Sequence, residues 1–252
     1  MFGKEVKHTL RFVFRLVFSR SAWQQAAKNP PYFFCFIQGI IRHPLLFSRT
    51  RKVDGLISPY IGAELYDAVT KSKHPSRNVI EVGAYKGLST IQLATACRKV
   101  NKRVKSFEIF SGLPEIDSTL DKGFNKGDFS SDMNIYENNL KSCGVRDLVD
   151  LTIGDARQTM PAVINNDGFA VAFLDVDLYE IMKDLMLQLI PICRGGEVLV
   201  IHDTDHDGVR KAVNEIHTLT EHTIKEKRLE GGASVKLEIP LNFTGNKIKE
   251  NV

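Results

Sequence analysis

The chain has 252 residues, of which 43% are hydrophobic and 25% are charged. This composition is typical of a globular protein, and the length suits one α/β domain with an extension better than two full domains. The four cysteines stand far apart without a CxxC pair. This argues against a disulfide framework or a zinc site and favours a reducing, cytoplasmic location.

The net charge of +4 is unevenly distributed along the chain. Residues 1–52 hold ten Lys or Arg and one acid, so they carry +9 and the remaining residues carry −5. A mildly acidic body without a base-flipping motif disfavours nucleic acid as a partner. The basic segment alone is expected to meet a negative surface or to make a regulatory contact.

Residues 1–55 form the predicted N-terminal extension, which is basic and partly amphipathic. Its apolar helical face holds Leu10, Phe14, Val17 and Phe18, and its basic face holds Lys7, Arg11 and Arg15. No small-residue cleavage site follows, and the apolar run Tyr32–Ile41 is too short to span a bilayer. Two interpretations stay open. The helix either packs on the domain or on a second subunit of a homo-oligomer, or it lies on an anionic membrane as a peripheral contact.

Residues 56–240 are expected to form one α/β domain, followed by a polar tail over residues 241–252. Ser58-Pro59 is typical of an N-cap and the first turn of a helix that ends at about residues 71–74. The expected strands are Asn78–Val82, Arg103–Phe107, Leu148–Ile153, Ala170–Leu174, Glu197–Ile201, Thr223–Glu226 and Ser234–Leu237. The expected helices after the first are Thr90–Lys99, Met133–Ser142, Met182–Ile192 and Val209–Leu219. This alternation predicts a doubly wound, mostly parallel sheet that is covered on both faces.

The turn after the first strand carries the strongest local signal. The strand ends in an acid, Glu81, then turns through Gly83 and Gly87, and a helix opens at Ser89. Glycine lets the backbone approach a ligand closely, and a helix N-terminus offers unpaired N–H groups. The spacing is E-x-G-x-x-x-G instead of the G-x-G-x-x-G that binds a pyrophosphate. An acid at this place suits a cationic or hydrogen-bond-donating ligand.

Each of the first five strands ends in polar, mostly acidic residues. They are Glu81, Glu108, Asp155, the pair Asp175 and Asp177, and the run His202, Asp203 and Asp205. Ligands of open α/β sheets bind at the carboxyl ends of the strands, so we expect these side chains to surround one site. Glu108 lies about twenty residues after the glycine turn, where an acid binds a ribose diol. Asp155 could accept a hydrogen bond from an adenine amino group.

Six short motifs follow one another in a fixed order. They are E-V-G-x-x-x-G-x-S, F-E-x-F-x-G-L-P-E (Phe107–Glu115), G-D-A, L-D-x-D-L-Y-E (Leu174–Glu180), G-G-x-x-x-x-x-H-D (Gly195–Asp203) and G-V-R-K-A-V (Gly208–Val213). This order resembles the macrocin O-methyltransferase (TylF-type) family of class I methyltransferases. The resemblance runs from about Ser58 to Ala233, and residues 1–50 lie outside it.

The resemblance implies a Rossmann-like sheet of seven strands with an antiparallel last strand, which binds S-adenosylmethionine (SAM) across its first half. By position, Glu81, Gly83 and Gly87 would line the methionine end. Glu108 would bind the ribose, and Asp155 would lie at the adenine. The full set of expected cofactor-binding residues is Glu81, Gly83, Ala84, Tyr85, Gly87, Ser89, Glu108, Asp155, Ala156 and Asp175.

Metal-dependent relatives bind Mg²⁺ after the fourth and fifth strands, and the equivalent residues here are Asp175, His202 and Asp203. Asp175 and His202 are also the expected catalytic residues. His202 stands where an acid is usual, and Leu178 stands where catechol-type relatives carry a catalytic lysine. Imidazole suits zinc, iron or nickel better than Mg²⁺. Three roles for His202 stay open. It could neighbour a metal held by the aspartates, with or without Asp177, act as a general base without metal, or orient the acceptor.

The expected function is O-methylation of a hydroxyl on a small molecule, which could be a sugar, a glycan or a natural product. The alternatives are a nucleotide-binding oxidoreductase and a SAM-binding module without turnover. The missing G-x-G-x-x-G argues against the oxidoreductase, as do Asp175 and Asp203, whose carboxylates would repel a pyrophosphate. The acids present at every expected cofactor position argue against the inactive module.

Overall fold

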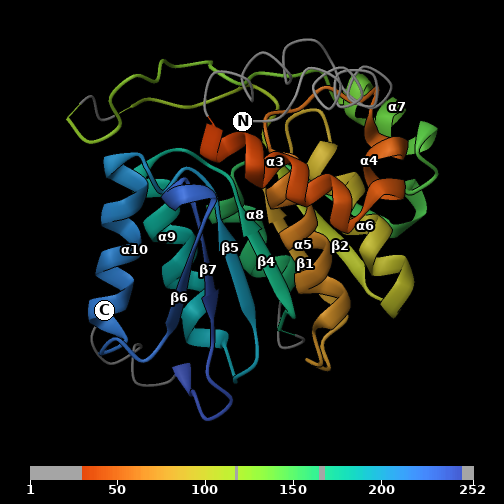
Figure 1. Cartoon of the computed structure of the whole chain (residues 1–252). Helices are drawn as coiled ribbons and strands as arrows, with labels where there is room; N and C mark the ends of the chain where they lie inside the picture. The colour runs from red at the N-terminus through yellow and green to blue at the C-terminus, as the bar shows by residue number, and fades with distance from the viewer. Residues whose placement is uncertain (1–29, 117–118, 165–167, 246–252) are drawn as a thin grey trace.

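The computed structural model describes residues 30–116, 119–164 and 168–245 (Figure 1). A seven-stranded sheet forms the centre of the molecule, with helices on both faces. The fold class expected from the sequence is therefore confirmed. The amphipathic stretch predicted over residues 7–18 lies outside the described residues, as does most of the polar tail.

The strand order is β3-β2-β1-β4-β5-β7-β6, and β7 runs antiparallel to both of its neighbours. The other neighbouring strands pair in parallel. The strands are β1 Asn78–Val82, β2 Arg103–Glu108, β3 Val149–Ile153, β4 Val171–Leu174, β5 Val198–Ile201, β6 Lys225–Leu229 and β7 Ser234–Glu238. The order departs from β1 in both directions, so the ends of β1 and β4 flank the switch point at which such sheets bind ligands.

Helices α5, α6 and α7 cover one face of the sheet, and α8, α9 and α10 cover the other. Helices α3 and α4 pack on the outside of α5 and α6. The helices are α3 Pro30–Arg42, α4 Pro44–Thr50, α5 Pro59–Lys71, α6 Leu88–Val100, α7 Met133–Ser142, α8 Ala156–Ile164, α9 Tyr179–Leu189 and α10 Asp207–Leu219. The expected N-cap is present, because the Ser58 hydroxyl accepts from the N–H of Ile61 at 3.2 Å.

Helix α8 is not predicted by the sequence pattern, because it contains Pro161. Proline lacks the N–H that would bond to the carbonyl four residues earlier, which belongs to Arg157. In the structure, the side-chain amide of Gln188 on α9 donates to this carbonyl at 3.0 Å. A side chain from 31 residues away therefore replaces the missing helical hydrogen bond.

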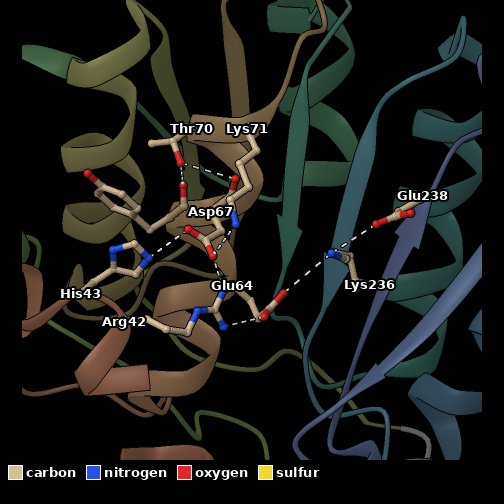
Figure 2. A network of polar contacts seen from close by, with 9 residues as sticks. Arg42, His43, Glu64, Asp67, Thr70, Lys71, Lys236 and Glu238 are labelled. Atoms are coloured by element: carbon tan, nitrogen blue, oxygen red, sulfur yellow. Dashed lines mark hydrogen bonds and ion pairs between the residues drawn. The ribbon is translucent and has the colours of Figure 1, made fainter. Parts of the chain in front are cut away.

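An ion-pair network fixes the N-terminal helices to the rest of the domain (Figure 2). Arg42, the last residue of α3, binds Glu64 at 2.7 Å and also binds Asp67, both on α5. His43 lies 2.9 Å from Asp67, and Lys236 of β7 lies 3.8 Å from Glu64. Burial alone would raise the pKa of Asp67, but the hydrogen bonds led by that of Arg42 lower it below its ordinary value.

Asparagine at position 67 would keep the size of the side chain and remove its charge. We expect Asp67→Asn to lower the free energy of unfolding by about 1–3 kcal/mol at neutral pH, because Arg42 loses a charge-assisted hydrogen bond. Since the folded-state pKa is lowered, this stabilisation is present above the ordinary aspartate pKa and is lost as the pH falls below it. Urea denaturation at about pH 7 and about pH 3 measures both effects.

Glu115→Gln provides the control for this prediction. Glu115 forms an exposed ion pair with Lys126, and such pairs add little to stability. The urea midpoint of this variant should match that of the unchanged protein. If the two substitutions cost the same, the network around Asp67 does not anchor the N-terminal helices.

Candidate functional site

A cavity of ≈ 320 Å³ opens at the carboxyl ends of β1 to β5. Its volume falls within the range of small-molecule sites. Ten of the residues predicted to bind a cofactor or a metal line it. They are Gly83, Ala84, Tyr85, Ser89, Glu108, Asp155, Ala156, Asp175, His202 and Asp203. The structure thus brings together the polar ends of β2 to β5, as the sequence predicts, and adds to them the glycine turn after β1.

Gly83 allows the ends of β1 and β4 to touch. It has a φ of +86°, and a Cβ atom at this position would lie 1.9 Å from the carbonyl oxygen of Asp175. Its N–H donates to the backbone carbonyl of Phe107 at 3.1 Å, and the N–H of Asp175 donates to the backbone carbonyl of Val82 at 3.0 Å. Only glycine permits both this backbone conformation and this contact. Gly83 lines the cavity as predicted, but the contact that excludes a side chain comes from the protein's own backbone.

Glu108 organises the floor of the cavity through four backbone hydrogen bonds. Its Oε2 atom accepts from the N–H groups of Ala84 and Tyr85 at 2.7 and 2.6 Å. Its Oε1 atom accepts from those of Ile109 and Phe110 at 2.7 and 2.9 Å. One carboxylate therefore fixes both the turn after β1 and the turn after β2.

Asp155 immediately precedes helix α8 and lines the cavity beside Ala156. Its Oδ1 atom accepts from the N–H of Arg157 at 2.9 Å, and the guanidinium of Arg157 binds Oδ2 at 2.6 Å. The hydrogen bond from this guanidinium lowers the pKa of Asp155. The side chain is therefore an ionised acceptor at neutral pH, as the proposed contact with an amino group requires.

Glu81 lies outside the cavity lining, contrary to the expectation that it faces the methionine end. Side chains alternate along β1, so Glu81 points with Val79 toward the α6 face, where it is fully buried. Its Oε2 atom accepts from Thr90 at 2.6 Å and from Ser106 at 2.8 Å. Its Oε1 atom has no hydrogen-bond partner among the described residues. Burial raises the pKa of Glu81 to about 7.

Gly87 is the second predicted cofactor residue that does not line the cavity. It is the N-cap of α6 and has a φ of +88°. A Cβ atom here would lie 2.8 Å from Leu140 and 3.1 Å from Tyr136, both on α7. The packing of α7 against the start of α6 therefore accounts for this glycine.

An acid–imidazole cluster of Asp175, Asp177, His202 and Asp203 lies where β4 and β5 end. The Nδ1 atom of His202 is 3.2 Å from Asp175 Oδ1 and 2.7 Å from Asp203 Oδ2. The side chains of these three residues are only 13–22% exposed. Asp177 lies in hydrogen-bond contact with Asp203. The predicted convergence of the two strand ends is therefore present, with the imidazole between two carboxylates.

The electrostatics of the cluster favour a cation between the carboxylates. Burial and the charges of Asp175 and Asp203 raise the pKa of Asp177 to about 9. Burial alone would lower the pKa of His202, but the two neighbouring carboxylates raise it well above its ordinary value. With no other cation between them, His202 is an imidazolium that donates to the aspartates.

The same residues fit a divalent metal. One atom each from Asp175, His202 and Asp203 lie within 4.8 Å of one another. A second group, Asp203 with Asp205 and His206, meets the same limit but is more exposed. Carboxylates suit Mg²⁺ or Mn²⁺, whereas imidazole suits zinc, iron or nickel. The donor set therefore fits a divalent transition metal at least as well as Mg²⁺.

The apolar part of the cavity was not predicted from the sequence. It is formed by Leu56, Ile57, Leu113, Pro114, Phe124, Phe129 and Ile181. The ring of Phe124 lies 6.1 Å from that of Phe129 and 4.8 Å from that of His206, between centroids. Asp121 holds this connection between β2 and α7 against α9, because it accepts from the N–H of Tyr179 at 2.9 Å. Aromatic residues between two predicted elements were the available signal, but their place over the cavity depends on such tertiary contacts.

Residues 80–204 match a family model described as a methyltransferase domain. This range includes the glycine turn, Glu108 and the acid–imidazole cluster. The description does not specify the macrocin O-methyltransferase family, so the motifs support that finer assignment only as a resemblance. No curated protein matches the chain significantly.

Several solved structures share the fold. The O-methyltransferase NovP is 17% identical, with a TM-score of 0.62 over 73% of this chain and 81% of its own. The calicheamicin methyltransferase CalS11 is 21% identical, with a TM-score of 0.59 over 80% and 85%. The O-methyltransferase TomG from Streptomyces achromogenes, solved with SAM, is 18% identical, with a TM-score of 0.54 over 95% and 100%. The chain therefore has the Rossmann-like methyltransferase fold.

Glu81 is expected to make the stability of the fold depend on pH. Its pKa rises from the ordinary 4.5 to about 7 on folding. Burying its charge therefore lowers stability as the pH rises across this interval, by roughly 3 kcal/mol. Glu81→Gln stays uncharged and does not lose this stability. The free energy of unfolding of the variant, relative to that of the unchanged protein, should therefore be higher at pH 8 than at pH 5. Urea denaturation of both proteins at these two pH values measures the gain, and a difference that is the same at both would contradict the prediction.

Proposed function

We propose that the protein is a SAM-dependent O-methyltransferase that acts on a hydroxyl of a small metabolite or glycan. The observation that carries the proposal is a single cavity that joins the turn held by Glu108 to the acid–imidazole cluster. The match of residues 80–204 to a methyltransferase domain supports the reaction class over an oxidoreductase. NovP and TomG, which share the fold, are O-methyltransferases, and this agrees with oxygen as the acceptor atom.

In this proposal, SAM lies along the carboxyl ends of β1, β2 and β3. The contacts proposed are Gly83, Ala84, Tyr85 and Ser89 at the methionine end, Glu108 at the ribose, and Asp155 with Ala156 at the adenine. The carboxylate of Glu108 is already fixed by four N–H groups before a ligand binds. A group that is held in place in this way loses little conformational freedom on binding.

The reaction transfers a methyl group from sulfur to oxygen. The hydroxyl oxygen of the acceptor attacks the methyl carbon, the carbon–sulfur bond breaks, and its electron pair stays on sulfur to give S-adenosylhomocysteine. We assign Asp175 as the group that takes up the hydroxyl proton. Burial raises the pKa of Asp175, which makes its carboxylate a stronger proton acceptor than an ordinary aspartate.

His202 acts beside Asp175 as the cation that balances the two carboxylates, since its imidazole donates toward both. A divalent metal held by Asp175, His202 and Asp203 would supply the same charge balance, lower the pKa of the acceptor hydroxyl and orient it. The mixed oxygen and nitrogen donors make Mn²⁺ or Fe²⁺ suitable beside the expected Mg²⁺.

The apolar lining supports an acceptor that carries an apolar or aromatic body as well as a hydroxyl. Leu113, Phe124 and Phe129 line the cavity together with the cluster. Aromatic and aliphatic side chains bind ring systems through surface burial and stacking. A hydroxylated natural product therefore suits this cavity better than a free sugar.

Glu108→Ala tests the cofactor site. We expect the affinity for SAM and S-adenosylhomocysteine, measured by titration calorimetry, to fall about tenfold or more. The reason is that the charge-assisted hydrogen bonds of Glu108 each contribute roughly 1.5–3 kcal/mol. Glu115→Ala, on an exposed side chain outside the cavity lining, should bind SAM as the unchanged protein does. An unaltered affinity in Glu108→Ala would remove the ribose assignment.

Removal of divalent metal tests the catalytic cluster. We expect EDTA to abolish methyl transfer and Mg²⁺ or Mn²⁺ to restore it, while SAM still binds, because only a metal would both lower the pKa of the acceptor hydroxyl and orient it. Asp203→Ala should lower kcat far more than it lowers SAM affinity. The readout is the formation of S-adenosylhomocysteine with a panel of hydroxylated acceptors.

His202→Ala separates the remaining roles of this residue. A metal-neighbouring or orienting role predicts activity that excess metal partly restores. A general base predicts low activity at every metal concentration, together with loss of the ascending limb of the pH profile. Full activity in EDTA combined with an inactive His202→Ala would contradict both the metal proposal and the assignment of Asp175 as proton acceptor, and would leave the histidine as the base.

A further inference from the structure

The exposed large apolar side chains gather at one end of the molecule. Among the described residues, these side chains are Phe34, Ile41, Leu45, Leu56, Ile109, Phe129, Met133, Ile135, Ile153 and Leu241. All except Leu241 belong to α3, α4, the segment before α5, the chain from the end of β2 to the first turn of α7, or the last residue of β3. Figure 1 shows α3, α4 and the connection after β2 together at one end of the molecule, drawn at the top.

Helices α3 and α4 present an apolar face to the outside, formed by Phe34, Ile41 and Leu45. We call it the α3–α4 face. Ile41 is 73% exposed and Leu45 is 85% exposed, whereas Phe36 and Phe47 on the inner side are fully buried. The inner side therefore packs these helices on the domain, and Ile41 and Leu45 remain exposed on the outer side. Exposed apolar groups at this density mark an interaction surface.

The chain leads from α4 directly to the rim of the cavity. Leu56, six residues after α4 ends, lines the cavity and is still 61% exposed. Ile109 and Phe129 line the cavity from the other strand end and are also exposed. A surface that contacts α3 and α4 would therefore lie beside the entrance of the candidate active site.

Basic side chains accompany this apolar face. Arg49, Arg51 and Lys52 are exposed at the end of α4, and no acid occurs between Arg42 and Val53. The whole segment of residues 1–52 carries +9, whereas the rest of the chain carries −5. Basic groups beside exposed apolar groups are the composition of a segment that lies in the interface of an anionic bilayer.

We propose that the α3–α4 face docks on an anionic lipid surface, with Ile41 and Leu45 at the acyl boundary and Arg49 and Lys52 at the headgroups. None of the helices in the described part of the chain has the length and apolar content to cross a bilayer. The contact proposed here lies in the interface of the bilayer. A second copy of the chain fits this face less well, because a two-fold interface would bring two strongly basic segments together.

The ion-pair network of Figure 2 makes this face a fixed platform. Arg42 joins the end of α3 to Glu64 and Asp67 on α5, and His43 joins the start of α4 to the same Asp67. The orientation of both helices relative to the sheet is thereby set before any surface is met. Docking would place the cavity entrance at the bilayer without a rearrangement of the domain.

Vesicle sedimentation of the full chain tests the proposal. The probes are vesicles of phosphatidylcholine alone and vesicles in which about a third is phosphatidylserine. We expect binding only to the anionic vesicles, weakening with added salt. Ile41→Glu with Leu45→Glu should lower the partition coefficient at least tenfold. Arg49→Ala and Lys52→Ala should each lower it about fivefold, because one basic residue near such a surface contributes about 1 kcal/mol.

Leu241→Glu is the matched control, since Leu241 is 87% exposed but lies beyond β7 at the opposite end of the sheet. It should bind vesicles as the unchanged protein does. Circular dichroism and urea midpoints establish that all variants fold. The proposal is overturned if the unchanged protein does not bind anionic vesicles. It is also overturned if the Ile41 and Leu45 double variant has the same partition coefficient as the unchanged protein. The proposal is also overturned by a third result. In that result, light scattering shows that the unchanged protein is a dimer that binds no vesicles, and that the double variant is a monomer. The SAM titration is a separate measurement, so failure of docking leaves the proposed reaction standing.

Discussion

The arrangement of the candidate site depends on one backbone contact between the ends of β1 and β4. Gly83 approaches the carbonyl of Asp175 so closely that no side chain fits between them. The same two residues begin the glycine turn and the acid–imidazole cluster. A main-chain contact therefore fixes the distance between the proposed cofactor and the proposed catalytic groups. Such a contact is stiffer than a pair of side chains, because no rotamer change can relax it.

Strand ends and side-chain periodicity account for most of what the sequence predicts correctly. Glu108, Asp175 and His202 were placed at one edge because parallel strands end on the same side of a sheet. Glu81 shows the limit of this reasoning. It is the last polar residue of β1, yet the alternation of the strand turns it toward α6, and both faces of this strand are buried. A fully buried strand gives no polar face from which that direction could be predicted.

Features that depend on residues far apart in the sequence were not predictable. The apolar lining of the cavity comes from the segment before α5 and from the connection after β2, which meet only in the folded chain. The pairing of Arg42 with Asp67 also joins two helices whose relative position the sequence pattern does not contain. In both cases the local sequence shows which side chain is present, but only the tertiary structure shows which residue that side chain contacts.

Helix α8 has a consequence for the order in which the chain folds. Its proline leaves the carbonyl of Arg157 without a local donor, and the amide that binds this carbonyl belongs to Gln188 on α9. A nine-residue helix is marginal by itself, and this one also lacks an internal hydrogen bond. We therefore expect α8 to become stable only after α9 has packed on the sheet. Asp155 immediately precedes α8 and accepts from its Arg157 N–H, so the end of the cavity formed here would be completed late in folding.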